Sequence, residues 1–479
     1  MSCATCPVSR RRFLLASAGL LSPFRLAGSD GAARGPWDGP AVVRKVYLGG
    51  ARAGWPRPDV DLQQDVAGIE ARLAKLERSY PGRIQFTGGE LIRTDTELEA
   101  WLEHLDDADA VLAFNMITII YPRLRRIVET GKPTLMFAVP YAGHDWTHAA
   151  AMAQKGMRID LIASSDFGDL DPYVELFQTI HHLRYSKVLL MAPERARPKT
   201  EGYAQQFGTL FAFPSYLDLE AAYDAAPAGK AARLATEFIR AAEQVVEPKP
   251  EEIADSLRLH LAIQALLEQA KANAIAIDCL GGFGRGELPA YPCVSFSKLN
   301  DAGLYGVCEC DLESTMTQLL VTPFSRMPGF VSDPVFDTSR NEVIHAHCVS
   351  ATRLVGIDRA PSPYRVRSHL EDHKGVSMQV LAPAGGPVTV ARFADPKKMM
   401  VSGGEAIGNA DDERGCRTKI RTRVPDSAKL LANWAAALNT GPDMPGTRDL
   451  LHRVVFYGDH IRQIERLGRL LGFQVVREA

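Results

Sequence analysis

Residues 110–139 read AVLAFNMITIIYPRLRRIVETGKPTLMFAV and contain the unit on which the fold depends. Ala110–Phe114 and Pro133–Val139 are short apolar runs of strand length, and Tyr121–Thr130 between them is predicted as a helix. A helix that connects two short apolar strands predicts a βαβ unit, in which the two strands lie parallel in one sheet.

The same alternation of strands and helices extends from this unit in both directions. The further elements are predicted strands at Lys45–Gly49, Arg83–Phe86 and Asp160–Ser165, and helices at Val66–Tyr80 and Asp95–Leu105. We therefore expect an N-terminal α/β domain over residues 43–171. The Gly- and Pro-rich residues 31–42 before it are predicted to be a linker.

The alternation begins again after residue 172 and then changes character. The second set comprises predicted strands at Lys187–Ala192, Thr209–Pro214 and Asn273–Asp278, with helices at Lys230–Val245 and Ile253–Lys271. This set predicts a second α/β domain over 172–325. From 326 to 479, β-rich segments between Gly/Pro turns predict a third domain, which ends in helices. The predicted fold class is α/β: two Rossmann-like α/β domains with parallel sheets, then a β-rich, barrel-like C-terminal domain.

Composition limits the possible partners of the chain. Its 479 residues contain 55 Lys+Arg against 57 Asp+Glu, so the net charge of −2 argues against a nucleic-acid-binding surface or a polybasic membrane anchor. Eight cysteines are too few for a disulfide scaffold in a chain of this length. We expect a small-molecule partner, no nucleic acid and no membrane-spanning helix.

The N-terminal segment has the order of a signal peptide. Arginines at 10–12 directly precede an apolar run from Phe13 to Leu21, which is too short to span a bilayer. Small residues follow at 27–29, and the SRRRFL form is similar to a twin-arginine export signal. We predict that residues 1–30 are a signal and that the protein is exported, to the periplasm or the extracellular space. A basic, mildly apolar disordered tail is the alternative.

Acidic side chains stand at two places, one inside the second predicted domain near its end and one at the start of the third. Glu309 and Asp311 come just before the apolar helix start LESTMTQLL, and Asp333 precedes a proline. Two acids at an otherwise apolar helix start are unusual, because buried carboxylates need a partner. The alternatives are that Asp311 caps the helix while Glu309 is solvated, and that Asp333 is an ordinary turn residue.

Histidines follow the carboxylates in the sequence. In a strand, His345 and His347 point to the same face and form a plausible half of a metal site, although such pairs also occur as hydrogen-bonded core residues. His460 stands before the last predicted helix and could be an ordinary first-turn residue. Carboxylates together with imidazoles suit a divalent cation such as Mn²⁺.

Residues 278–393 resemble the L-fucose isomerase/L-arabinose isomerase superfamily, in particular its L-fucose isomerase C-terminal-domain-like proteins. The matching motifs are IDC at 277–279, the PC–S–LND–G–YG–CE–D run at 292–311, PGF to Asp at 328–333, HAHC at 345–348 and VTVARF at 388–393. The family architecture, two α/β domains and a barrel-like third, agrees with the order of elements predicted above.

The resemblance implies an intramolecular oxidoreductase, an aldose–ketose sugar isomerase that works through a cis-enediol with Mn²⁺ or another divalent cation. Glu309 and Asp333 match the two catalytic, metal-binding carboxylates, and His460 matches the C-terminal metal ligand. His347 matches a further histidine of the arabinose branch, with His345 as its alternative. The family also implies a homo-oligomer, because a neighbouring subunit usually completes the cleft.

Four further residues are candidates for sugar binding: Asp278, Asp311, His345 and His369. Asp278 ends a predicted parallel strand, where α/β sheets bind ligands, although a cap on the following Gly turn is equally plausible. The export signal is unusual for this family. An exported carbohydrate-binding or sensing protein that keeps the fold without turnover is therefore the alternative function, and an epimerase or lyase using the same enediolate is a third.

Overall fold

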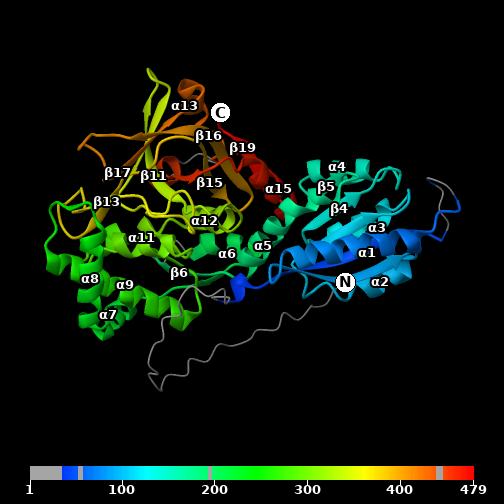
Figure 1. The fold of residues 1–479 in the computed structure, drawn as a ribbon, viewed down its shortest axis with the longest axis horizontal. Helices are drawn as coiled ribbons and strands as arrows, with labels where there is room; N and C mark the ends of the chain where they lie inside the picture. The colour runs from blue at the N-terminus through cyan, green and yellow to red at the C-terminus, as the bar shows by residue number, and fades with distance from the viewer. Residues whose placement is uncertain (1–34, 52–54, 56–57, 193–196, 439–445) are drawn as a thin grey trace, which may run out of the picture.

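The computed structural model describes residues 35–51, 55, 58–192, 197–438 and 446–479, so the predicted signal at 1–30 lies outside the described residues. The chain is a mixed α/β protein with two parallel sheets and a closed antiparallel barrel. Figure 1 shows the N-terminal unit at one side of the molecule and the barrel stacked on the second unit at the other side. Among the described residues, no helix is both long enough and apolar enough to cross a membrane.

The first sheet is five-stranded, parallel and ordered β2-β1-β3-β4-β5, a doubly wound arrangement. Its strands are β1 (Ala41–Leu48), β2 (Ile84–Ile92), β3 (Ala110–Asn115), β4 (Thr134–Ala138) and β5 (Ile159–Ala163). Its helices are η1 (Pro36–Asp38), α1 (Leu62–Ser79), α2 (Asp95–Leu102), α3 (Tyr121–Glu129), α4 (Trp146–Gln154), η2 (Phe167–Leu170) and α5 (Asp171–Tyr185). The βαβ unit predicted from residues 110–139 is present as β3, α3 and β4.

One boundary of this unit differs from the prediction. Strand β1 begins at Ala41, inside the predicted linker over 31–42 and before the predicted strand start at Lys45. Ala41 and Val43 are fully buried, and the strand pairs with β2 on one side and β3 on the other. A central position in the sheet therefore outweighs the Gly- and Pro-rich sequence just before the strand.

The second sheet is four-stranded, parallel and ordered β10-β9-β6-β7. Its strands are β6 (Lys187–Met191), β7 (Leu210–Ala212), β9 (Ala274–Ile277) and β10 (Tyr305–Val307). The helices of this unit are α6 (Arg197–Phe207), α7 (Tyr216–Ala225), α8 (Ala228–Ala241), α9 (Pro250–Ala270), α10 (Cys279–Gly284), α11 (Cys293–Asp301), η4 (Cys308–Cys310) and α12 (Leu312–Ser325). Predicted strands at 187–192, 209–214 and 273–278 thus correspond to β6, β7 and β9.

The C-terminal region is a closed barrel of six antiparallel strands. The ring runs β15-β18-β11-β12-β17-β16 and closes because β15 also pairs with β16, while β19 adds to β16 from outside. The strands are β11 (Phe330–Asp337), β12 (Glu342–His347), β15 (Pro387–Asp395), β16 (Lys398–Asn409), β17 (Thr418–Arg423), β18 (Arg453–Tyr457) and β19 (Gln474–Arg477). The helices are α13 (Ser427–Asn433), α14 (Thr447–Leu451) and α15 (Ile461–Leu471).

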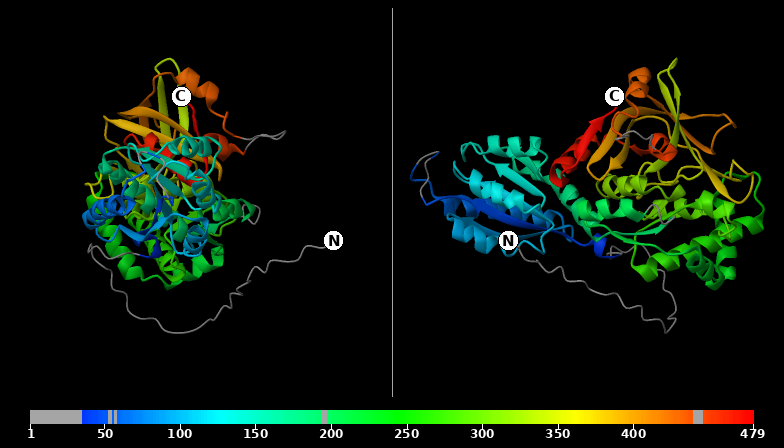
Figure 2. Two further views of the ribbon diagram at one scale, coloured as in Figure 1. Left: turned by 90° about the vertical axis from the view of Figure 1, so that its right-hand side faces the viewer. Right: turned by 180° about the vertical axis from the view of Figure 1, so that it is seen from behind.

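A small sheet and one helix join the units. Strand β14 (Ser377–Val380) pairs with β13 (Tyr364–Arg367) outside the barrel, and β13 in turn pairs with β8 (Gln244–Val245) of the second unit. Figures 1 and 2 show α15 between the barrel and the N-terminal unit. There Arg469 donates to the Asp160 carboxylate at 2.7 Å, which ties α15 to β5.

Candidate metal centre

The candidate site lies where the second sheet meets the barrel. Strands β9 and β10 are parallel neighbours, and the chain turns at Asp278 and at Cys308 as it leaves them. Carboxyl ends of parallel strands are the usual ligand-binding edge of α/β sheets. Strand β11 supplies Asp333, β12 supplies His347, and His452 stands directly before β18. Residues far apart in the sequence therefore converge at one edge.

Glu309 is held in an unusual backbone conformation. Its φ is 57° and that of Cys310 is 53°, both in the left-handed region that residues other than glycine rarely adopt. Such strain persists only where the surrounding structure holds it, and it is common at functional sites. In an extended strand, adjacent side chains point to opposite faces; the left-handed turn interrupts this alternation at Glu309. The turn thereby directs the Glu309 carboxylate toward the barrel.

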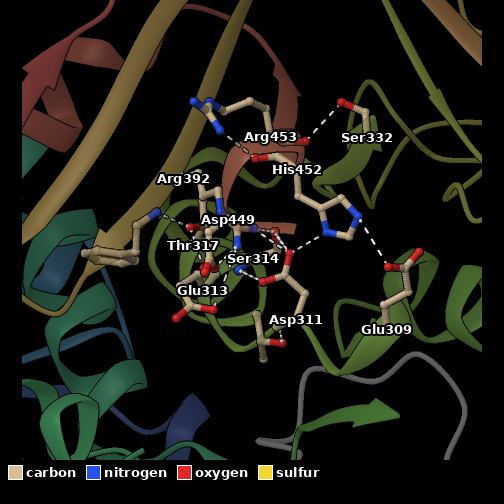
Figure 3. A network of polar contacts seen from close by, with 12 residues as sticks. Glu309, Asp311, Glu313, Ser314, Thr317, Ser332, Arg392, Asp449, His452 and Arg453 are labelled. Carbon is tan, nitrogen blue, oxygen red and sulfur yellow. Dashed lines mark hydrogen bonds and ion pairs between the residues drawn. The ribbon is translucent and has the colours of Figure 1, made fainter. Parts of the chain in front are cut away.

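Two imidazoles face the two oxygens of Glu309. The Oε1 atom lies 3.8 Å from Nε2 of His347, and Oε2 lies 3.7 Å from Nε2 of His452. The same Nε2 atom of His452 is 3.3 Å from Oδ1 of Asp333. Figure 3 shows the His452 ring between Glu309 on one side and Asp311 on the other. Two carboxylates from different elements therefore face one imidazole nitrogen.

Asp311 fixes the orientation of His452 from behind. Nδ1 of His452 lies 2.7 Å from Oδ2 of Asp311, and the other oxygen, Oδ1, accepts from the Ser314 backbone N–H at 3.0 Å, so Asp311 also caps α12. Nη1 of Arg392 donates to Oδ2 at 2.5 Å, and both of these charged side chains are 1% exposed. Figure 3 shows this chain of contacts. A carboxylate that holds one ring nitrogen leaves the other aimed at a ligand, as in many metal centres.

The charges of the cluster depend on one another. Burial would raise the pKa of Asp311, but the Arg392 guanidinium and His452 hold it well below its usual value. Burial would lower the pKa of His452, but its hydrogen bonds to Asp311 and Asp333 raise it to about 9. A cation that binds Nε2 must displace a proton held there, so its affinity will depend on pH.

The donor atoms fit a divalent cation. Ligand atoms of Asp333, His347 and His452 all lie within 4.8 Å of one another, and so do those of Cys308, Glu309 and His347. The imidazoles are buried, whereas the side chains of Glu309 and Asp333 are 21% and 35% exposed. Carboxylate and imidazole ligands suit Mn²⁺ and its neighbours. The two carboxylates are therefore the more exposed members of this group.

His345 and His347, both predicted as candidates, lie in different surroundings. His347, at the end of β12, belongs to the cluster, whereas His345 does not. The ring nitrogens of His345 lie 3.1 Å from the hydroxyls of Ser332 and Thr422, and burial lowers its pKa to about 3. His345 is thus a hydrogen-bonded core residue, the alternative considered from the sequence.

The structure also places His460 outside the cluster. Its Nε2 atom lies 2.7 Å from the Tyr457 carbonyl oxygen, and its ring packs edge-on against Phe324. His452 takes the position expected of His460 and was not among the residues predicted from the sequence. The available signal was a histidine directly before the apolar strand RVVFY at 453–457, but nothing local shows that this strand lies beside β11.

The other sequence candidates lie around the cluster in supporting positions. Asp333 lies within strand β11, not in a turn. Asp311 is buried behind His452, so it orients that ring instead of facing a ligand. Asp278 caps α10 by accepting from the Gly281 N–H at 3.4 Å, and Arg285 lies 3.7 Å from its carboxylate. The expected capping alternative therefore describes Asp278.

His369 lies beside the cluster next to an aromatic pair. Its ring centroid is 5.4 Å from that of Tyr291, which stacks on Phe283 at 3.9 Å. Burial would lower the pKa of His369, but the neighbouring Cys348 sulfur and Asp372 raise it to about 9. Cys348 directly follows the cluster residue His347, so His369 stands at the border of the site.

Comparisons with known proteins add no family assignment: the sequence matches no protein-family model and no curated protein.

Proposed function

We propose that the protein is a metal-dependent aldose–ketose isomerase that acts through a cis-enediol. The observation that carries the proposal is the placement of Glu309 and Asp333, whose carboxylates lie 3.7 and 3.3 Å from the same His452 nitrogen. They come from η4 and β11, two elements of different units, and both are partly exposed. The resemblance of residues 278–393 to the fucose/arabinose isomerase superfamily supports this reading.

The reaction moves a proton between C2 and C1 of a sugar, which needs a base and an acid beside the same two carbons. Glu309 and Asp333 are the groups of the cluster able to do this from the accessible side. His347 and His452 lie on the buried side of the site, and the contact with Asp311 orients the His452 ring. Tight positioning of the two carboxylates lowers the entropic part of the barrier.

The residues that would hold the metal are Glu309, Asp333, His347 and His452, with His452 in place of His460. A bound Mn²⁺ or similar cation would stabilise the negative charge that develops on the O1 and O2 oxygens of the sugar. The donor set is mixed, so other divalent cations also fit it.

Proton NMR in D₂O tests the proposal directly. The Mn²⁺-loaded protein is incubated with a panel of aldoses, and the spectra are recorded after the metal is removed. Loss of the C2 proton signal and growth of a ketose would establish enediol chemistry and show which sugar class reacts. A protein that binds Mn²⁺ and sugar but exchanges no proton would support the alternative, a carbohydrate-binding protein without turnover.

The reassignment of the third ligand predicts a difference between two histidines. Replacing His452 with Gln should weaken Mn²⁺ binding by about 100-fold or more, because the change removes an oriented donor. Replacing His460 with Gln should leave the dissociation constant unchanged, because His460 contacts Tyr457 and Phe324 instead. Isothermal titration of both variants measures the two constants. Equal losses in the two variants, or a loss only in the His460 variant, would contradict the placement of His452.

We also infer that the chain forms a homo-oligomer through the carboxyl edge of the first sheet. Ile119 and Tyr141 follow β3 and β4 and are 79% and 77% exposed. Both have φ near 70°, so two bulky apolar side chains are held outward by strained backbone. Light scattering should show an oligomer for the wild type and dissociation after Tyr141→Lys. A wild-type monomer would refute the inference.

A further inference from the structure

Cys308 adds a sulfur to the candidate metal centre, and the proposed reaction has no use for it. Its sulfur, the Glu309 carboxylate and the His347 imidazole form the second group of donors within 4.8 Å of one another. Cys308 is 7% exposed, and its sulfur lies 3.2 Å from that of Cys279, at the start of α10. The sulfur is thus fixed beside two of the proposed Mn²⁺ ligands.

The strained turn explains how adjacent side chains can serve one cation. Cys308 and Glu309 are consecutive, and in a regular strand they would point in opposite directions. The left-handed conformation of Glu309, with φ at 57°, allows both side chains to approach His347. An observed backbone outlier of this kind is a reason to look for a function.

The two donor groups differ in the cations that they prefer. Asp333, His347 and His452 offer oxygen and nitrogen, which suit Mn²⁺ and Mg²⁺-like ions as well as borderline metals. Cys308, Glu309 and His347 offer sulfur as well, and thiolates select soft or borderline cations such as Zn²⁺ and Cd²⁺. Because His347 belongs to both groups, the two positions cannot be filled independently.

We propose that Cys308, Glu309 and His347 form a second, thiolate-containing position for Zn²⁺ or Cd²⁺, which overlaps the proposed Mn²⁺ position and competes with it. On binding, the Cys308 thiol loses its proton to water and the thiolate sulfur becomes a ligand, without oxidation or reduction. Glu309 is then a ligand of the soft cation next to the sulfur and can no longer take part in proton transfer. A soft cation therefore inhibits the proposed isomerase. The inference rests on the proposed function only for this inhibitory consequence, not for the binding itself.

Cadmium is the probe that tests the position. Adding Cd²⁺ to the reduced wild-type protein should produce thiolate-to-Cd²⁺ charge-transfer absorption in the ultraviolet and should displace bound Mn²⁺, whose release is followed by electron paramagnetic resonance. Cys308→Ser should abolish the absorption and lower the preference for Cd²⁺ over Mn²⁺ by about 10- to 100-fold. Cys293→Ser is the matched control, because Cys293 is an equally buried thiol of the same core cluster and should retain both properties.

Cadmium-113 NMR is done on the wild-type protein, so its result does not depend on how well the variants fold. The chemical shift of the bound ¹¹³Cd shows whether sulfur is a ligand. A shift without sulfur ligation, or an absorption that survives in Cys308→Ser, would overturn the proposal. If Cd²⁺ binds through Cys308 but Mn²⁺ binds nowhere, the second position stands and the proposed function fails. If Mn²⁺ binds and Cd²⁺ uses no sulfur, the second position fails and the proposed Mn²⁺ centre stands.

Discussion

Replacing Glu309 with Gln is expected to reduce aldose–ketose turnover by about 100- to 10,000-fold, the usual contribution of a general acid or base. The amide has nearly the same size as the carboxylate, so the strained turn at residues 308–310 can be kept. It cannot accept the substrate proton, however, and it carries no charge toward His347 and His452. The rate of C2 proton exchange, measured by NMR at saturating Mn²⁺, gives the effect.

Two further variants serve as controls for the effect of Glu309→Gln. Glu405→Gln makes the same chemical change at an exposed residue of strand β16 and should leave turnover unchanged. Asp333→Asn should lower turnover on a similar scale, because Asp333 faces the same His452 nitrogen. A Glu309→Gln protein that is folded, binds Mn²⁺ and retains wild-type turnover would show that Glu309 is not the catalytic group.

The N-terminal and second units were the most predictable parts of the fold because their signals are local. The apolar runs at 110–114 and 133–139 are buried strands, and the segment between them is helix α3. A strand that is buried on both faces consists of consecutive apolar residues, and such a run can be recognised in a single sequence. The start of β1 was less visible, because the burial of Ala41 depends on its pairing with a strand more than forty residues away.

The barrel and its site depend on contacts that no local pattern contains. Strand β18 pairs with β11, although residues 453–457 and 330–337 are far apart in the sequence. That pairing brings His452, and not His460, to the carboxylates. The resemblance pointed to Glu309, Asp333 and His347, which the structure does bring together, yet the choice between two histidines near the C-terminus required the register of the barrel.

Asp311 shows how two interpretations of one residue can hold together. The cap expected from its position before α12 is present, since the Ser314 N–H donates to Oδ1. The partner expected of a buried carboxylate is present too, because Oδ2 contacts Arg392 and His452. A carboxylate has two oxygens and several acceptor directions, so capping and ring orientation do not exclude each other. Sequence alone could not show this, because Arg392 comes from a distant strand.

A buried ion pair between Arg392 and Asp311 lies directly behind the site. Replacing Arg392 with Met should lower the free energy of unfolding by about 3–5 kcal/mol, the usual result of removing one partner of a buried pair. Methionine fills much of the volume, but it leaves the Asp311 carboxylate, 1% exposed, without its guanidinium. Glu313, which lies 3.8 Å from Arg392, loses a neighbouring charge as well. Urea unfolding with a chelator present measures the change without a contribution from bound metal.

The same substitution should also weaken the metal centre, which separates a specific role of Arg392 from general destabilisation. Arg392 is the first of the charges that hold the Asp311 pKa low, so its loss raises that pKa and weakens the support of His452. We therefore expect weaker Mn²⁺ binding under conditions where the variant is folded. Arg477→Met is the matched control: it removes an exposed ion pair with Glu465 and should cost about 1 kcal/mol or less, with Mn²⁺ affinity unchanged. An Arg392→Met protein as stable as the wild type would show that the pair with Arg392 does not stabilise the fold, and that the remaining contacts of Asp311 with His452 and Ser314 are enough for its buried carboxylate.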